Sequence, residues 1–241
     1  MNKRSHLTLA ATMLSFSGIA SADFTNGPNP YNPGFGFDAP HEASWGGWTR
    51  GDAGTLYAEW DTFFDASYGT ATDRTAAPDV GSANTSNAYF GWSAGTFAAG
   101  TGNLYSFSVP QNYNAIVTGS VGEGPVVRAV LQFETWGTQI NYESIALNGL
   151  APTFTEQTYF QDGYPSSFGP VDLVHFLAYW DLPAELLTYN FSFGSGAHQS
   201  LAQVAVDIAA VPVPGAVWLM GSAILGLAGW RRRQYSTATA G

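Results

Sequence analysis

Apolar and polar residues alternate one by one in short runs that recur across residues 23–210 of this 241-residue chain. Successive side chains of a β-strand point to opposite faces, so each run predicts a strand with one buried face and one face in water. The clearest runs span 104–109, 127–134, 188–193 and 203–208. No long stretch of the sequence has the 3.6-residue period of a helix. The pattern therefore predicts an all-β domain.

Further candidate strands are bounded by the Gly, Pro and Asn residues typical of turns, and they span 56–60, 88–92, 115–121, 144–147, 153–160 and 173–180. About ten short strands without an internal repeat favour a single β-sandwich, and among sandwiches the jelly roll. The chain contains no cysteine. Disulfides, thiolate metal sites and cysteine nucleophiles are therefore excluded, and packing must hold the sheets together.

Two segments depart from the strand pattern. Residues 23–50 contain four prolines and five glycines, which block helices and central strands, so they predict an extended lead-in segment to the domain. Residues 66–87 are small and polar, which predicts a long loop.

Charge is distributed unevenly along the chain. Residues 23–210 hold 3 basic and 18 acidic residues, a net charge of −15, and the other five basic residues lie near the two ends. A domain this acidic is not built to neutralise phosphates, which argues against a nucleic-acid partner. Its charge favours solubility and bridging through divalent cations over adhesion to anionic polymers.

The N-terminal 22 residues have the form of a secretory signal peptide. A short basic stretch with Lys3 and Arg4 precedes an apolar run, and Ala20 and Ala22 supply the small residues that a signal peptidase reads. We expect cleavage before Asp23, which exports the domain at 23–210.

The C-terminus combines an apolar run with a basic cluster. No residue between 215 and 230 is charged, and Arg231, Arg232 and Arg233 follow directly. The run is near the shortest length for a membrane-spanning helix, and the arginines would keep residues 235–241 in the cytoplasm as a short tail. The sequence therefore predicts a membrane anchor with the domain outside.

Residues 211–234 resemble the PEP-CTERM sorting signal of Gram-negative bacteria. The resemblance rests on Val-Pro-Val-Pro at 211–214, the Gly-rich apolar run and the arginine cluster. Val213 stands between Pro212 and Pro214 where the family has Glu, which marks a variant of the motif. The resemblance implies processing by an exosortase and delivery to the cell surface or the extracellular polysaccharide matrix.

Paired carboxylates perform acid–base chemistry in glycosidases, and the candidate pairs are Glu59 with Asp61 and Glu134 with Glu143. Glu59 and Asp61 would share one face of a strand that alternates with Trp60. Because 18 acidic residues generate such pairs by chance, solvated carboxylates are the simpler interpretation.

The histidines give no firmer catalytic pattern. His175 lies in an apolar strand, which favours a hydrogen-bonded core histidine over a ligand. Ser195 and His198 lie in FGSGAH, which lacks the G-x-S-x-G spacing of a nucleophile elbow. The sequence therefore predicts a protein that is not an enzyme.

Metal and glycan binding are the remaining kinds of site. Calcium prefers carboxylate and carbonyl oxygens on loops, so Asp65, Asp73 and Asp79 are weak candidates for it, and no other cofactor is expected. Exposed aromatic rings stack on the flat CH faces of sugars. The candidate rings are Trp45 and Trp48, which flank a Gly-Gly pair, and Trp136, which ends a strand.

Three functions stay open at this point. The leading hypothesis is a non-enzymatic secreted protein of the cell surface or extracellular matrix, sorted by an exosortase-type system. The alternative is a carbohydrate-binding module that uses exposed Trp residues. An extracellular hydrolase that acts on polysaccharide has the least support.

Overall fold

The computed structural model describes residues 27–63, 75–76, 78–81, 87–122 and 124–211. In these ranges every regular element is a β-strand, and there is no helix that could cross a membrane. The predicted signal peptide with Ala20 and Ala22, the sorting signal from Pro212 onward and the tail at 235–241 lie outside the described residues.

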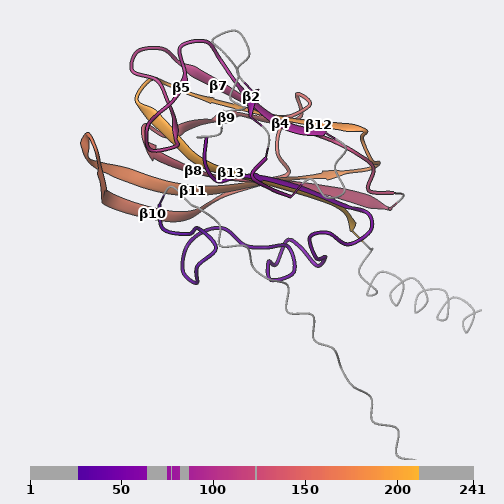
Figure 1. Cartoon of the computed structure of the whole chain (residues 1–241). Coiled ribbons are helices and arrows are strands. Elements are labelled where there is room, and N and C mark those ends of the chain that lie inside the picture. Colours follow the sequence, from indigo (N-terminus) through magenta and orange to yellow (C-terminus); the bar gives the residue numbers. More distant parts are fainter. Residues whose placement is uncertain (1–26, 64–74, 77, 82–86, 123, 212–241) are drawn as a thin grey trace, which may run out of the picture.

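The strands form two antiparallel sheets that lie one above the other (Figure 1). The larger sheet holds β1 (Thr55–Trp60), β3 (Val80–Gly81), β5 (Phe97–Ala98), β6 (Leu104–Tyr105), β8 (Val126–Gly137), β10 (Phe154–Ser166), β11 (Gly169–Leu182) and β13 (Gln199–Val211). The smaller sheet holds β2 (Thr75–Ala76), β4 (Asn87–Trp92), β7 (Gln111–Thr118), β9 (Ile140–Leu147) and β12 (Thr188–Ser195). The chain is therefore all-β with the two-sheet architecture of a sandwich.

Strand order brings distant parts of the chain side by side. The strand order of the larger sheet is β10-β11-β8-β13-β1-β3, with β6 paired to the first residues of β13 and β5 paired to β6. The strand order of the smaller sheet is β2-β4-β7-β12-β9. The last strand, β13, pairs with both β1 and β8 and so lies in the middle of the larger sheet.

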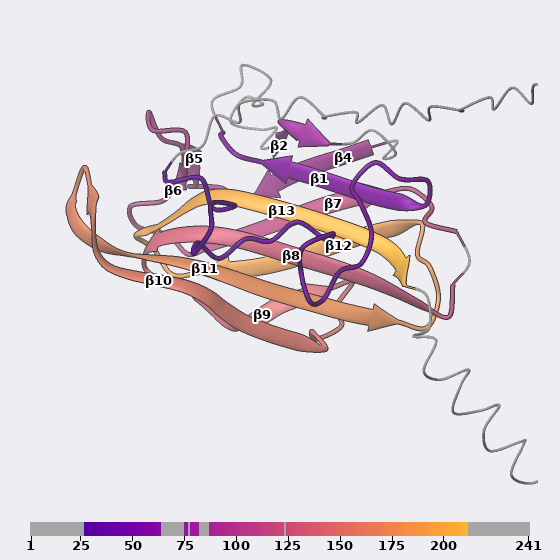
Figure 2. The same cartoon turned by 90° about the horizontal axis from the view of Figure 1, so that it is seen from below.

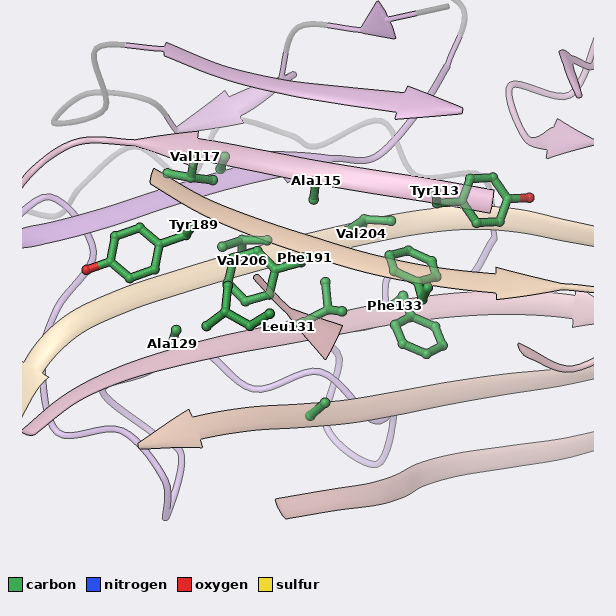
Figure 3. Packing of buried hydrophobic residues seen from close by; sticks show 14 of the residues in the cluster. Tyr113, Ala115, Val117, Ala129, Leu131, Phe133, Tyr189, Phe191, Val204 and Val206 are labelled. Carbon is green, nitrogen blue, oxygen red and sulfur yellow. The ribbon is translucent and has the colours of Figure 1, made fainter. Parts of the chain in front are cut away.

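Aromatic and aliphatic side chains from both sheets fill the space between them (Figure 3). Phe133 of β8 stacks on Phe193 of β12 with ring centroids 5.0 Å apart and planes 9° apart. Tyr113 of β7 lies 5.3 Å from Phe193 by the same measure. Because all three rings are almost fully buried, they provide the interlayer packing of a domain without disulfides.

The strand periodicity predicted the inner faces of β8, β12 and β13 correctly but not that of the run at 104–109, where Leu104 is buried and Phe107 is 53% exposed. Leu131 and Phe133 of β8 and Val204 and Val206 of β13 all point into the sandwich core. One run is shorter than predicted, because β6 ends at Tyr105 instead of continuing to Val109. There the Ser106 hydroxyl donates to Val109 O and accepts from Val109 N–H, which closes a turn instead of a strand.

The lead-in segment, here residues 27–50, is folded against the outer face of the larger sheet. Both cartoons show this indigo chain running across β8, β11 and β13 (Figures 1 and 2). Its turns are closed by its own backbone, for example by Gly47 N–H donating to Pro40 O at 2.7 Å. The expectation that the polar face of these strands lies in water is therefore wrong: Gln132, Glu134 and Asp207 are at most 1% exposed.

One arginine of the lead-in neutralises the acidic centre of this covered face. Arg50 donates to both carboxylate oxygens of Asp207 at 2.7 Å and to Glu59 at 3.1 Å. A further N–H of Arg50 donates to the Tyr31 hydroxyl oxygen at 2.8 Å. Although burial alone lowers the pKa of Arg50, the charges around it hold that pKa well above its usual value.

We predict that Arg50→Met lowers the free energy of unfolding by about 3–5 kcal/mol, because it leaves the buried Asp207 and Glu59 without their cation. Urea unfolding at neutral pH measures the change. Arg128→Met is the matched control: it removes a partly exposed ion pair with Asp181 and a hydrogen bond to Trp45 O but leaves no fully buried carboxylate without a cation, so we expect a loss of about 1–2 kcal/mol. Equal losses for both variants would contradict this account.

The same cluster predicts an alkaline limit to stability. Burial, and then the charge of Glu59, raises the pKa of Tyr31 well above its usual range, against the lowering effect of Arg50. An unfolded Tyr ionises near pH 10, so the stability from folded Tyr31 is complete below about pH 10 and is lost as pH rises toward the folded pKa. Tyr31→Phe should flatten the fall of unfolding free energy above pH 10 by up to about 1.4 kcal/mol per pH unit.

Urea titrations at a series of pH values test this prediction. The exposed Tyr89 supplies the matched control variant, Tyr89→Phe. A slope for Tyr31→Phe equal to that of the wild-type protein would remove Tyr31 as a cause of alkaline unfolding.

Candidate ligand-binding groove

A groove of about 540 Å³ opens on the outer face of the larger sheet, at the end where β5, β6 and the tip of the β10–β11 hairpin lie (Figure 2). Its lining is dominated by rings and small polar residues: Phe97, Ala99, Gly100, Thr101, Tyr105, Phe107, Trp136, Gly137, Ser166, Ser167, Phe168, Val171, His198 and Ser200. This volume lies within the range of roughly 300–1,000 Å³ common for small-ligand sites.

Sheet pairing places the floor of the groove. Trp136 of β8 lies opposite Ser200 of β13, and Ser200 lies opposite Tyr105 of β6. Residues directly opposite each other in an antiparallel pair point to the same face. Strands from three parts of the sequence therefore deliver Trp136, Ser200 and Tyr105 side by side.

Aromatic rings form the walls. Phe168 stacks on Tyr105 with ring centroids 5.7 Å apart and planes 17° apart, and Phe97 stacks on Phe107 at 5.6 Å and 25°. Tyr105 meets Phe107 edge-on at 4.8 Å. Phe97, Phe107 and Phe168 are 40%, 53% and 72% exposed, so much of each ring remains open to water.

A tight turn places Phe168 over the groove. Gly169 has φ +105°, which favours glycine, and the Ser166 hydroxyl donates to Gly169 O at 2.6 Å. Register shifts between β10 and β11 precede this turn, and such irregularities bend a hairpin. The bend carries Phe168 to Tyr105, although β8 and β13 lie between β11 and β6 in the sheet.

Among the described residues, the polar groups of the groove include no carboxylate, ammonium or guanidinium group. None of the described lining residues is Asp, Glu, Lys or Arg. His198, held at φ +64° in the turn before β13, has its Nδ1 3.1 Å from the Tyr105 hydroxyl. Together with the hydroxyls of the Ser and Thr residues, these groups can exchange hydrogen bonds with an uncharged polar ligand.

A buried carboxylate holds the indole of Trp136. Trp136 Nε1–H donates to Glu134 Oε1, and the indole packs against Tyr164 with ring centroids 5.0 Å apart. Burial, and then the charge of Glu134, raises the pKa of Tyr164 above its usual value. The N–H of Trp136 is thus directed toward the protein, and its ring contributes apolar surface to the groove.

The structure separates the predicted tryptophans. Trp136 lines the groove, whereas Trp45 is only 6% exposed and packs on Val130 and Leu177 beneath the lead-in segment. Trp48 is half-buried and meets Trp45 edge-on at 5.8 Å. The Trp45–Trp48 pair therefore offers no open ring face comparable to that of Phe168.

The predicted carboxylate pairs are not arranged as open acid–base sites. Glu59 lies on β1 and Asp61 follows the last residue of that strand, and both are 2% exposed, so the expectation that they are solvated is wrong. Glu134 lies on β8 and Glu143 on β9, which belong to different sheets. Arg50 of the lead-in segment binds Glu59 of the first pair, and the two members of the second pair lie on separate sheets.

Ser195 and His198 have different partners. Ser195 Oγ lies 3.2 Å from Gln199 Oε1, whereas His198 contacts Tyr105. His175 is a fully buried face histidine whose Nδ1 accepts a hydrogen bond from Gly36 N–H, as its apolar strand predicted. These contacts do not form a Ser–His relay.

Only one of the predicted calcium ligands lies in the described part of the chain. Asp79 Oδ2 accepts from the backbone N–H groups of Asp61 and Thr62 at 2.9 and 3.0 Å. Asp65 and Asp73 lie outside the described residues. Within the described ranges no three His, Asp or Glu side chains are grouped as metal ligands would be.

Sequence reasoning missed four of the five rings in the groove: Phe97, Tyr105, Phe107 and Phe168. One local signal existed, because Ser167-Phe168-Gly169 places a large apolar residue in a turn between two strands. The convergence of this turn on Tyr105 depends on sheet pairing between distant segments, which no local pattern encodes.

Comparisons with known proteins leave the chain without an assigned relative. It matches no protein-family model, no curated protein and no solved structure.

Proposed function

We propose that the protein is a non-enzymatic, exported protein of the cell surface or extracellular matrix whose domain binds an uncharged glycan in the aromatic groove. The observation that carries this proposal is the convergence of three exposed rings, Phe97, Phe107 and Phe168, on one hollow without charged lining residues. Exposed apolar patches of this kind mark binding sites.

The chemistry of the groove favours a sugar. A pyranose ring has a face of CH groups that complements the electron-rich face of an aromatic ring, and its hydroxyls need uncharged donors and acceptors. Tyr105, His198 and Ser200 supply such groups beside the rings. The net charge of −15 on residues 23–210 disfavours polyanionic polymers and so points to a neutral glycan.

Export and sorting form the second part of the proposal. Ala20 and Ala22 would direct signal cleavage, and the stretch from Pro212, Val213 and Pro214 to Arg231, Arg232 and Arg233 would anchor the precursor in the inner membrane for an exosortase. The released domain would then act in the polysaccharide matrix of a Gram-negative bacterium. Calcium bound at Asp65, Asp73 or Asp79 is a secondary proposal.

The finer fold assignment also remains a proposal. We infer a jelly-roll-like arrangement, because the chain changes sheet between β7 and β8, β8 and β9, β9 and β10, β11 and β12, and β12 and β13. Repeated crossing between two sheets is typical of jelly rolls.

We predict that Phe168→Ala weakens binding of a neutral oligosaccharide about fivefold, because each ring contact is worth roughly 1 kcal/mol. A glycan array identifies the oligosaccharide, and calorimetry measures its dissociation constant. Phe160→Ala is the matched control, since Phe160 is also an exposed ring of the β10–β11 hairpin but does not line the groove.

Two results would contradict glycan binding. One is an array without binding in either the presence or the absence of calcium. The other is an affinity for apolar dyes or peptides that depends on Phe168 while every glycan fails to bind. Polysaccharide cleavage that is lost in Glu59→Gln would instead favour the hydrolase.

Mass spectrometry of the protein in the surface fraction tests sorting. We expect a chain that begins at Asp23 and ends near 211–214, because cleavage there removes the apolar run and the arginines. An Arg231→Ala, Arg232→Ala, Arg233→Ala triple variant should reduce the amount of processed protein, since the arginines set the orientation of the segment. Surface protein that extends intact to Gly241 would rule out exosortase processing.

A further inference from the structure

A continuous chain of polar contacts runs from the lead-in segment to the wall of the groove. Gly36 N–H donates to His175 Nδ1 at 3.0 Å, and His175 Nε2 lies 2.8 Å from Glu134 Oε2. The other oxygen of Glu134 accepts the N–H of Trp136. His175 on β11 lies opposite Glu134 on β8, and both side chains are 0% exposed.

The hydrogen bond from Gly36 determines which ring nitrogen of His175 carries the hydrogen. Because Nδ1 accepts from Gly36, it carries no proton, and the hydrogen of the neutral ring is on Nε2, the atom that lies 2.8 Å from Glu134 Oε2. One oxygen of Glu134 thus accepts the N–H of Trp136, and the other lies 2.8 Å from His175 Nε2, a close polar contact without the geometry of a hydrogen bond. A buried carboxylate held by a donor on one oxygen and by an imidazole against the other has little freedom to rotate.

Close packing keeps the lead-in segment against this chain. A methyl group at Gly36 would lie 2.8 Å from the Cβ of His175 and would also meet Thr158. His175 is further enclosed by rings, with Phe37 and Tyr159 at centroid distances of 5.3 and 5.1 Å. The position of His175 is therefore fixed from both sides.

Trp136 needs such a fixed partner because packing alone restrains its indole weakly. The second side-chain torsion of Trp has broad minima, and the ring is only partly buried at the groove. The bond to Glu134 selects the orientation that turns the N–H inward and the ring surface toward the ligand.

We propose that Glu134 and His175 are positioning residues of the groove, which hold Trp136 in the orientation that a ligand needs. This inference rests on the proposed function for its ligand, a neutral glycan, but its geometry can be tested without one. Neither residue lines the groove, so both act through Trp136.

Glu134→Gln is the central variant. An amide can accept from Trp136, but its NH₂ group then meets the N–H of His175, so one of the two contacts is lost. We expect glycan binding to weaken about tenfold, the scale on which a buried polar group loses its partner. Glu143→Gln, on the other sheet, is the matched control and should bind as the wild-type protein does.

A double-mutant cycle separates positioning from a general structural role. Trp136→Phe retains a ring but removes the indole N–H, so Glu134→Gln should cause no further loss of affinity in that background. An equal tenfold loss in both backgrounds would show that Glu134 does not act through Trp136 and would overturn the inference.

A ligand-free measurement covers the case in which Glu134→Gln does not fold or no glycan binds. In the ¹⁵N-tryptophan-labelled full-length protein, Trp136→Phe assigns the Trp136 indole resonance. We expect its N–H to be shifted downfield and to exchange slowly, in contrast to Trp48, whose Nε1 has no acceptor among the described residues. Fast exchange of the Trp136 N–H in the wild-type protein would overturn the inference.

Different results would contradict glycan binding and the positioning of Trp136. Absence of any glycan ligand, with a protected Trp136 indole, would remove the proposed function and leave the positioning chain intact. Glycan binding that depends on Phe168 but not on Glu134 would retain the proposed function and remove the chain.

Discussion

The contact between the lead-in segment and the outer face of the larger sheet is the constraint on which the other features depend. That face holds Asp207 and Glu59, and Arg50 is the cation that makes their burial tolerable. A buried charge without a partner costs several kcal/mol, so this sheet could not be covered by an uncharged segment. Because the lead-in covers the middle of the sheet, the groove opens at the end near Trp136 and Tyr105.

The alternation of apolar and polar residues was sufficient to predict most of the strands and the all-β fold. It assigned the inner face of β8 and β13, because only one register of a strand buries all its large apolar residues. Alternation does not show what lies on the second face, and there the prediction failed for Glu59, Asp61 and Glu134. A segment rich in Pro and Gly has no period from which its packing can be inferred, so the cover over these residues could not be predicted.

The candidate site was predictable only in part. Trp136 was identified as a ring at the end of a strand next to glycine, whereas Trp45, chosen because it flanks a Gly-Gly pair, is core. Local sequence could not distinguish the two, because the exposure of each ring depends on how the lead-in segment folds onto the sheet. The contact of Phe168 with Tyr105 likewise depends on a bent hairpin and on the pairing of β6 with β13, a strand much further along the chain.

Stability and site geometry share the same segment in this domain. The lead-in supplies Arg50 to Asp207 and, 14 positions earlier in the chain, supplies Gly36 to His175, so the cover and the groove are connected through buried polar contacts. Each hydrogen bond in these contacts requires a particular distance and angle, so together they favour one arrangement of the groups that they join. In a sandwich without disulfides, such a network can give a ligand site a rigidity that apolar packing supplies less specifically, since apolar side chains tolerate small shifts and directional bonds do not.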